Sequence, residues 1–197
     1  MHTENMPIKI FLASRSPRRK ELLKRLGLPF RVVKSSYREK IVSRNSPSQN
    51  AMRNAKGKAL SAKVNKEYGF VVGADTFIYF RSQIIGKPKN FSDACRILEK
   101  LSGNVHYVYT GLAVYDLRTK RIRVSYAKSK VTFKKLSRSV IKNYVHKWRP
   151  LDKAGAYAVQ EGGEKLIKKV EGSISNVIGL PIELFADELF RCAKDGV

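Results

Sequence analysis

The sequence predicts an α/β protein with a mixed β-sheet flanked by helices. Short apolar runs typical of buried strands alternate along the chain with stretches that carry apolar residues at helical spacing. Two long β-like runs, 105–115 and 122–133, flank the short segment 116–121, which predicts an antiparallel hairpin and excludes a purely parallel sheet. No repeat or linker divides the chain, so we expect one domain over 8–195 after an N-terminal extension, 1–7.

The first predicted strand leads directly into the first predicted helix. The apolar run 8–13 is typical of a short buried strand. Ser16 suits the N-cap of a helix and Pro17 suits its first position, because the missing proline N–H would be unpaired there in any case. Gly27 is expected to end this helix, and the run 30–33 predicts a second strand. The helix has an apolar stripe formed by Leu22, Leu23 and Leu26.

A second helix is predicted from its capping signal. Residues 46–49 read Ser-Pro-Ser-Gln, the pattern of a capping box, and the helix is expected to continue to about Lys66. The apolar run 70–74 predicts a strand that leads into Asp75 and Thr76, and 77–80 is a further apolar run.

The remaining elements alternate in the same way. A turn is predicted at 86–88, a helix from Ser92 to Gly103, and a helix over 137–148 after the hairpin. A short strand, 166–170, precedes a terminal helix, 181–193. The helix that begins at 92 is expected to face inward with Ala94, Ile97, Leu98 and Leu101. The helix that begins at 181 is expected to face inward with Ile182, Phe185, Leu189 and Phe190.

Charge is the strongest compositional signal. The chain has 40 Lys and Arg against 16 Asp and Glu, for a formal net charge of +24. Such a chain favours acidic partners: nucleic acid, anionic lipid or phosphorylated small molecules. No apolar stretch approaches the roughly 18 residues that span a bilayer, and no secretory signal precedes the first strand, so we expect no membrane partner and no secretion.

The cysteines and histidines do not indicate a metal site. Cys95 and Cys192 both lie in helical apolar patterns, which favours buried free thiols, with a single disulfide as the alternative. The three histidines are scattered, and no His/Cys cluster has metal-ligand spacing: His2, His106 and His146.

The first candidate site is the strand-to-helix junction Ser14-Arg15-Ser16-Pro17-Arg18-Arg19. A helix N-terminus offers unpaired N–H groups and partial positive charge, and arginine forks bind phosphate oxygens in pairs. Three arginines at an already positive helix end would repel one another without an anion. A phosphate site explains them, and an ordinary capped helix with solvated arginines is the alternative.

The second candidate is Asp75 with Thr76, directly after a buried strand, where α/β sheets place ligands. A carboxylate there could hold a divalent cation or orient a water, and a turn residue is the alternative. Lys87, between a glycine and a proline, could bind a phosphate. Lys58 and Glu39, taken alone, read as solvated side chains.

The segment 151–160 is a third candidate region. Gly155 among small residues suggests close backbone approach, and the Gln160 amide can both donate and accept, which suits the edge of a base. A turn before a strand is the alternative. None of these patterns is a P-loop, a Rossmann fingerprint or a serine-hydrolase elbow.

Taken together, these blocks resemble the Maf family of nucleoside triphosphate pyrophosphatases over about residues 8–190. The first block is the most specific of them. In chain order the blocks are Leu12-Ala-Ser-Arg-Ser-Pro-Arg-Arg-Lys-Glu-Leu-Leu23, Gly73-Ala-Asp-Thr76, Gly86-Lys-Pro88, Leu101-Ser-Gly103, Leu151-Asp-Lys-Ala-Gly-Ala-Tyr157 with Gln160, and Val177-Ile-Gly-Leu-Pro181.

The resemblance implies hydrolysis of a nucleoside triphosphate to a monophosphate and pyrophosphate. It implies a two-lobed fold like that of inosine-triphosphate pyrophosphatases, with a mixed sheet and a central cleft. It also implies a divalent cation, Mg²⁺ or Mn²⁺, and a cytoplasmic homodimer. The biological roles that it implies are removal of non-standard nucleotides and control of cell division.

The resemblance also assigns roles to single residues. Asp75 matches the proton acceptor, and Glu39 with Asp75 would hold the metal. The positions that set substrate choice are matched by Arg18, Thr76 and Gln160. Phosphate-binding positions are matched by Ser16, Arg19, Lys58 and Lys87. The chain departs from the family pattern at Glu161, which separates Gln160 from glycine, and at Arg38, which precedes Glu39.

The Pro-Arg-Arg block with Ala-Asp-Thr and with Tyr157-x-x-Gln160 resembles the branch that acts on dTTP and UTP. A purine or 7-methyl-GTP pyrophosphatase on the same fold is the alternative; the 7-methyl-GTP branch has Asp-Gln in place of Asp75-Thr76. A nucleic-acid-binding protein is the runner-up from a different class. It is favoured by the +24 charge and by aromatics interleaved with basic residues over 118–149: Tyr126, Phe133, Tyr144 and Trp148. The alternative interpretation is that these aromatics belong to the core and that the charges lie on solvated faces.

Overall fold

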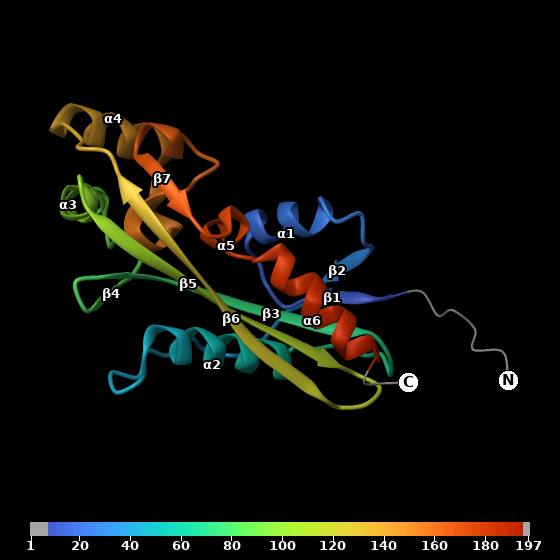
Figure 1. Ribbon diagram of the computed structural model, residues 1–197. Helices are drawn as coiled ribbons and strands as arrows, with labels where there is room; N and C mark the ends of the chain where they lie inside the picture. The colour runs from blue at the N-terminus through green and yellow to red at the C-terminus, as the bar shows by residue number, and fades with distance from the viewer. Residues whose placement is uncertain (1–7, 195–197) are drawn as a thin grey trace, which may run out of the picture.

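The computed structural model describes residues 8–194, so the predicted extension 1–7 lies outside the described residues. Within them the chain forms a seven-stranded sheet in the order β2-β1-β3-β5-β6-β7, with β4 paired to the far end of β3 (Figure 1). The strands are β1 (Ile10–Leu12), β2 (Phe30–Val32), β3 (Phe70–Phe80), β4 (Gln83–Ile85), β5 (Val105–Asp116), β6 (Ile122–Phe133) and β7 (Ile167–Glu171).

The sheet is mixed, as predicted. β1 pairs in parallel with β2 and β3, whereas all other strand pairs, the β5–β6 hairpin included, are antiparallel. The predicted class, a mixed sheet with flanking helices, is therefore confirmed. On one edge of β3, the short strand β1 pairs with the beginning of β3 and the short strand β4 pairs with its end. Residues 73–77 of β3 lie between these two paired parts.

Helices cover the two faces of the sheet unequally. On one face α2 (Pro47–Leu60) packs against β3 and β5, and Figure 1 shows α1, α4 and α6 on the other side. The opposite face packs α1, α5 and α6 against one half of the strands and α3 and α4 against the other half. The helices of that face are α1 (Pro17–Lys24), α3 (Phe91–Leu101), α4 (Arg138–Trp148), α5 (Ile174–Ile178) and α6 (Ile182–Lys194).

Two glycines allow α2 to lie unusually close to the sheet. A Cβ atom at Gly111 would overlap the backbone of Ala51, and one at Gly73 would overlap the carbonyl of Ala55. Any side chain at these strand positions would push the helix outward. The close approach places the residues of α2 that follow Ala51 directly beside the middle of β3.

The strand containing Asp75 is longer than predicted. The sequence interpretation put Asp75 and Thr76 after a strand, but β3 continues through both, because β5 pairs with it from Phe70 to Tyr79. Polar residues are tolerated in the strand because each has a partner: Asp75 bonds α2, and the Thr76 hydroxyl lies 3.0 Å from that of Thr110.

Two helix boundaries were predicted wrongly. α2 ends at Leu60 and not near Lys66, because the chain then pairs with an earlier segment through a bridge between Ser35 and Ala62. α3 begins after Asn90, whose side chain accepts the N–H of Asp93, and not at Ser92. The predicted N-caps Ser16 and Ser46 are both confirmed.

Packing in the last helix also differs from the prediction. Phe190, expected to face inward, is 61% exposed, and Cys192 takes the buried position instead. Neither cysteine forms a disulfide within residues 8–194, as expected, although Cys95 is only partly buried. The strand β4 and the short helix α5 were not predicted. No helix in the described part of the chain combines the length and hydropathy needed to cross a membrane.

A buried histidine gives the core a titratable group. His106 on β5 has no exposed surface, and its Nε2 atom lies 2.7 Å from the Tyr157 hydroxyl. Burial lowers the pKa of His106 from its usual 6.5 to about 4. The folded protein therefore keeps this ring neutral at pH values where the unfolded chain protonates it.

We predict that His106 makes the protein less stable in acid. Between pH 6.5 and 4 the unfolded chain binds a proton that the folded chain excludes, so the free energy of unfolding falls as pH falls, by about 3 kcal/mol from this group. Denaturant unfolding at a series of pH values should show a shallower fall for His106→Gln than for the wild type. The exposed His146→Gln control should follow the wild type, and parallel curves for His106→Gln would contradict the prediction.

Candidate active site

A cleft of about 790 Å³ opens at residues 73–77 of β3, between the parts of this strand that pair with β1 and β4. One wall comes from the start of α1, the segment after β2 and the inner face of α2. The other wall comes from the turn after β4, from residues 152–159 and from α5. The expected central cleft is therefore present, between the end of the sheet that carries α1 and the end that carries α3 and α4.

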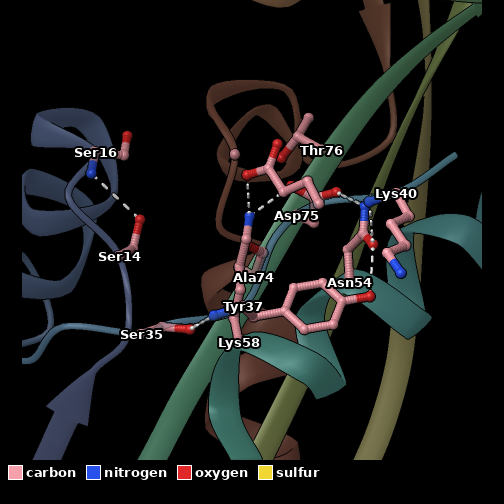
Figure 2. A network of polar contacts seen from close by, with 12 residues as sticks. Ser14, Ser16, Ser35, Tyr37, Lys40, Asn54, Lys58, Ala74, Asp75 and Thr76 are labelled. Carbon is pink, nitrogen blue, oxygen red and sulfur yellow. Dashed lines mark hydrogen bonds and ion pairs between the residues drawn. The ribbon is translucent and has the colours of Figure 1, made fainter. Parts of the chain in front are cut away.

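Asp75 lies at the floor of this cleft and is held by two donors from one helix. The residue is 5% exposed. Oδ1 accepts from Lys58 Nζ at 2.7 Å, and Oδ2 accepts from Asn54 Nδ2 at 2.8 Å (Figure 2). Asn54 and Lys58 are four residues apart on α2 and thus share a face. Each carboxylate oxygen keeps a second lone pair for a further ligand.

The Lys58 ammonium joins two carboxylates. Besides Asp75, it contacts Glu39 Oε1 at 2.6 Å and the carbonyl oxygen of Ala74 at 3.2 Å. Partial burial by itself would raise the pKa of Glu39. The hydrogen bond and the charge of Lys58 outweigh it, with smaller contributions from Lys87 and Arg19, so the pKa lies below its usual value. Glu39 is thus an anion at neutral pH, with 54% of its side chain exposed to the cleft mouth.

Arg19 is fixed by three elements at once. Its guanidinium donates to the carbonyl of Gly179 at 2.7 Å, to Ser14 Oγ at 3.2 Å and to Thr76 Oγ1 at 3.1 Å. Burial lowers the pKa of Arg19, and the charges of Asp75 and Glu39 oppose that effect. An arginine remains protonated under these conditions, so the cleft holds a rigid positive charge close to Asp75.

The start of α1 has the form expected of an anion site. Ser16 caps the helix by accepting the N–H of Arg19 at 3.5 Å, and the N–H of Ser16 donates to Ser14 at 3.2 Å. Arg18 lies on the same turn and pairs with Asp152 at 3.4 Å. The predicted phosphate-binding residues Ser16, Arg19, Lys58 and Lys87 all line the cleft.

The residues predicted to set substrate choice do not all reach the cleft. Arg18 and Thr76 line it, whereas Gln160 is exposed and outside the lining. The reason is a tight turn in which the N–H of Glu161 donates to the carbonyl of Ala158, which places Gln160 at the outer corner. No strand forms at this segment.

Sequence reasoning missed two side chains of the site. Asn54 is fully buried, and its Oδ1 atom accepts from the Tyr37 hydroxyl at 3.1 Å and from the N–H of Lys40 at 3.2 Å. Because a backbone N–H can only donate, the amide oxygen faces Lys40 and the amide nitrogen must face Asp75. Lys153 is buried in the opposite wall, 2.9 Å from Glu161. The sequence signal for Asn54 was its position one turn before Lys58 on the same helical face.

The carboxylates suit a cation only together with a ligand. Within residues 8–194, no group of three His, Cys, Asp or Glu side chains could hold a metal ion. Glu39 and Asp75 converge on the same Lys58 nitrogen, so two carboxylates are close together. Mg²⁺ is commonly held by one or two carboxylates plus phosphate oxygens and waters. The two carboxylates therefore suit a cation whose coordination is completed by a bound polyphosphate. They do not form a metal site from protein ligands alone.

The fold and the site define an α/β protein whose cationic cleft suits a phosphorylated ligand. The anchored carboxylate of Asp75 lies within this cleft. A family model described as Maf-like protein matches residues 9–192. The chain therefore belongs to the Maf family, and the family resemblance found in the sequence is confirmed.

Curated relatives extend over nearly the whole chain. A dTTP/UTP pyrophosphatase of Clostridium tetani is 42% identical over 178 residues, which cover 89% of this chain and 93% of that protein. A dTTP/UTP pyrophosphatase of Citrifermentans bemidjiense is 45% identical over 180 residues, 91% of this chain and 93% of that protein. Among solved structures, a HAM1 protein from Coxiella burnetii aligns with a TM-score of 0.39 and 18% identity over 64% of this chain and 73% of that chain.

We predict that Asn54 and Asp75 are energetically coupled. In a double-mutant cycle of Asn54→Ala and Asp75→Ala, the free energies of unfolding should deviate from additivity by about 1.5–3 kcal/mol, because the bond joins an amide to a charged group. The matched cycle of Tyr37→Phe with Asp75→Ala should be nearly additive, since Tyr37 contacts Asn54 and not the carboxylate. Additivity within about 0.3 kcal/mol in the first cycle would contradict the geometry.

Proposed function

We propose that this protein hydrolyses dTTP and UTP to the nucleoside monophosphate and pyrophosphate. The observation that carries the proposal is the Asp75 carboxylate, anchored by Lys58 and Asn54, at the floor of a cleft with fixed cations. The family and the names of the relatives agree with it: proteins 42% and 45% identical to this chain are dTTP/UTP pyrophosphatases.

The cations bind the triphosphate and stabilise the charge that moves during the reaction. The N-terminus of α1 supplies unpaired N–H groups, and Arg19 supplies a fixed positive charge beside them. When the bond between the α-phosphorus and its bridging oxygen breaks, the electron pair goes to the leaving pyrophosphate. Lys58 and Lys87 neutralise that charge, and prearranged charges of this kind are usually the largest contribution to phosphoryl-group chemistry.

Asp75 directs the attacking water. Its two oxygens each accept one bond from α2 and can each accept one more, from water in the cleft. The water oxygen attacks the α-phosphorus, its proton passes to Asp75, and the hydroxyl remains on the monophosphate. General-base assistance of this type typically contributes about 10²–10⁴-fold.

A divalent cation, Mg²⁺ or Mn²⁺, belongs to this proposal through the family resemblance. Glu39 and Asp75 are the residues that would hold it, together with phosphate oxygens. When bound, it would add positive charge at the phosphates. We also propose, from the resemblance alone, a cytoplasmic homodimer that removes non-standard nucleotides.

Arg18 and Thr76 are proposed to set substrate choice, since both line the cleft. Gln160 can contribute only if its turn folds toward the cleft when nucleotide binds. The pyrimidine assignment also rests on the pair Asp75-Thr76, which stands where the 7-methyl-GTP branch has Asp-Gln.

We predict pyrophosphate release from UTP and dTTP in the presence of Mg²⁺ that exceeds release from purine triphosphates and 7-methyl-GTP. Asp75→Asn should lower kcat by roughly 10²–10⁴-fold, because the amide cannot accept the proton. Asp116→Asn is the matched control: Asp116 is a buried carboxylate on the same sheet, bonded to the turn residues Arg118 and Thr119, and its loss should leave kcat near the wild-type value.

Two outcomes would overturn parts of this proposal. A clear preference for purine triphosphates would reject the pyrimidine assignment. A wild-type rate in Asp75→Asn would remove Asp75 from the mechanism. Pyrophosphate assays with Mg²⁺ replaced by EDTA decide whether the cation is needed.

A further inference from the structure

The active site does not account for one aromatic surface of the sheet. On the face that carries α2, a group of partly exposed tyrosines and lysines lies beyond the start of that helix. We call this group the tyrosine face: Tyr79 on β3, Tyr107 and Tyr109 on β5, and Tyr126, Lys128 and Lys130 on β6.

Strand register places these side chains on one face. Tyr79 is opposite Tyr107, which is opposite Lys130, and Tyr109 is opposite Lys128. Directly opposed residues in antiparallel strands point to the same side of a sheet. Gly111, where α2 crosses β5, is opposite Tyr126 and marks the end of the face nearest the helix.

The rings contact one another across three strands. The ring centroids of Tyr79 and Tyr109 are 6.2 Å apart, and those of Tyr109 and Tyr126 are 6.3 Å apart with planes tilted by 33°. The ammonium of Lys128 lies 4.3 Å from the centroid of Tyr107 and 5.6 Å from that of Tyr109. The result is a continuous aromatic surface with a positive charge above it.

No helix of the described chain covers this surface. α3 and α4 pack on the opposite face, through Ile78, Val108 and Val131. Figure 1 shows α2 below the sheet and α4 above it. Tyr126 is 46% exposed, a high value for an aromatic residue at the middle of a strand.

The charge of the surface is positive. Lys169 on β7 lies opposite Thr132 and extends the lysine group, while Glu171 pairs with both Lys130 and Lys169. Among the ion pairs of residues 8–194, Lys128 has no carboxylate partner and rests on the rings instead. Three lysines against one glutamate leave excess positive charge around the tyrosines.

These aromatics differ from the ones that the sequence suggested. Of the four interleaved with basic residues over 118–149, Phe133 and Tyr144 are buried in the core and Trp148 packs against it. Only Tyr126 belongs to the exposed surface. The remaining tyrosines come from β3 and β5, which strand pairing brings alongside it.

We propose that the tyrosine face binds single-stranded nucleic acid, independently of the cleft. Sheet surfaces with aromatics on neighbouring strands can stack successive bases, and lysines at their margin neutralise the backbone. The charge favours a polyanion over a second copy of this chain, because two such faces would bring six lysines together. Binding of nucleic acid at this face accounts for part of the net charge of +24 that lies outside the nucleotide cleft.

The test is fluorescence anisotropy with a labelled twelve-nucleotide oligo(dT) or oligo(U) at several salt concentrations. Tyr126→Ala should weaken binding roughly 5–100-fold through loss of one stacking ring. Lys128→Ala should weaken it and reduce the slope of log affinity against log salt by about 0.7, the value for one phosphate contact on a single strand.

The chain provides a matched control. Phe190 on α6 is 61% exposed, and Lys194 lies 4.6 Å over its ring, but this pair stands alone on a helix. Phe190→Ala with Lys194→Ala should leave oligonucleotide binding unchanged. Pyrophosphate release should be unaffected by Tyr126→Ala and Lys128→Ala, which separates a folding defect from a binding defect.

Three results would overturn the proposal. If Phe190→Ala with Lys194→Ala weakens oligonucleotide binding equally, the oligonucleotide is attracted to the basic protein as a whole and not to the tyrosine face. Displacement of the oligonucleotide by UTP would place binding in the cleft, whereas binding that persists in Asp75→Asn and in excess UTP supports the face. A wild-type dimer that Tyr126→Ala converts to monomer in sedimentation would assign the face to a second copy. The anisotropy and sedimentation measurements do not require that the protein hydrolyse UTP or dTTP.

Discussion

The candidate active site depends on the charge balance around the Lys58 ammonium. Two carboxylates, Asp75 and Glu39, converge on it at 2.7 and 2.6 Å, and without it they would repel each other. The balance requires α2 to lie almost against β3, which the absence of side chains at Gly73 and Gly111 permits. Backbone packing on one face of the sheet thus sets the geometry of the carboxylate that the proposed chemistry uses.

The same close approach explains how the two basic regions stay separate. α2 covers the middle of one face of the sheet. The cleft opens along the inner face of this helix, and the tyrosine face begins beyond the first turn of the helix. The positive charges around the cleft are restrained by ion pairs and hydrogen bonds, as Arg19 and Lys153 illustrate. Lys128, by contrast, rests on aromatic rings. Restrained cations suit a small ligand of fixed geometry, and exposed rings with lysines beside them suit a flexible chain.

Local signals in the sequence predicted most elements but not their relations. Caps such as Ser16 and Ser46 and the apolar periodicities are local, and they located the starts of α1 and α2 and the hairpin correctly. The continuity of β3 through Asp75 depends on pairing with β5, some 35 residues along the chain, which no local pattern carries. The position of Gln160 follows from a turn that the sequence did not reveal. Asn54 was not predicted because the role of an asparagine on a helix follows only from its contacts, here with Asp75 and Lys40, which the three-dimensional structure brings beside it.

The most direct test of the site is a crystal structure with a UTP analogue that cannot be cleaved between the α- and β-phosphates. We expect its phosphate chain at the N-terminus of α1, within hydrogen-bond distance of Arg19 and Lys58, with the α-phosphorus facing Asp75. A phosphate chain bound outside the cleft, or one with the α-phosphorus turned away from Asp75, would contradict the proposed chemistry.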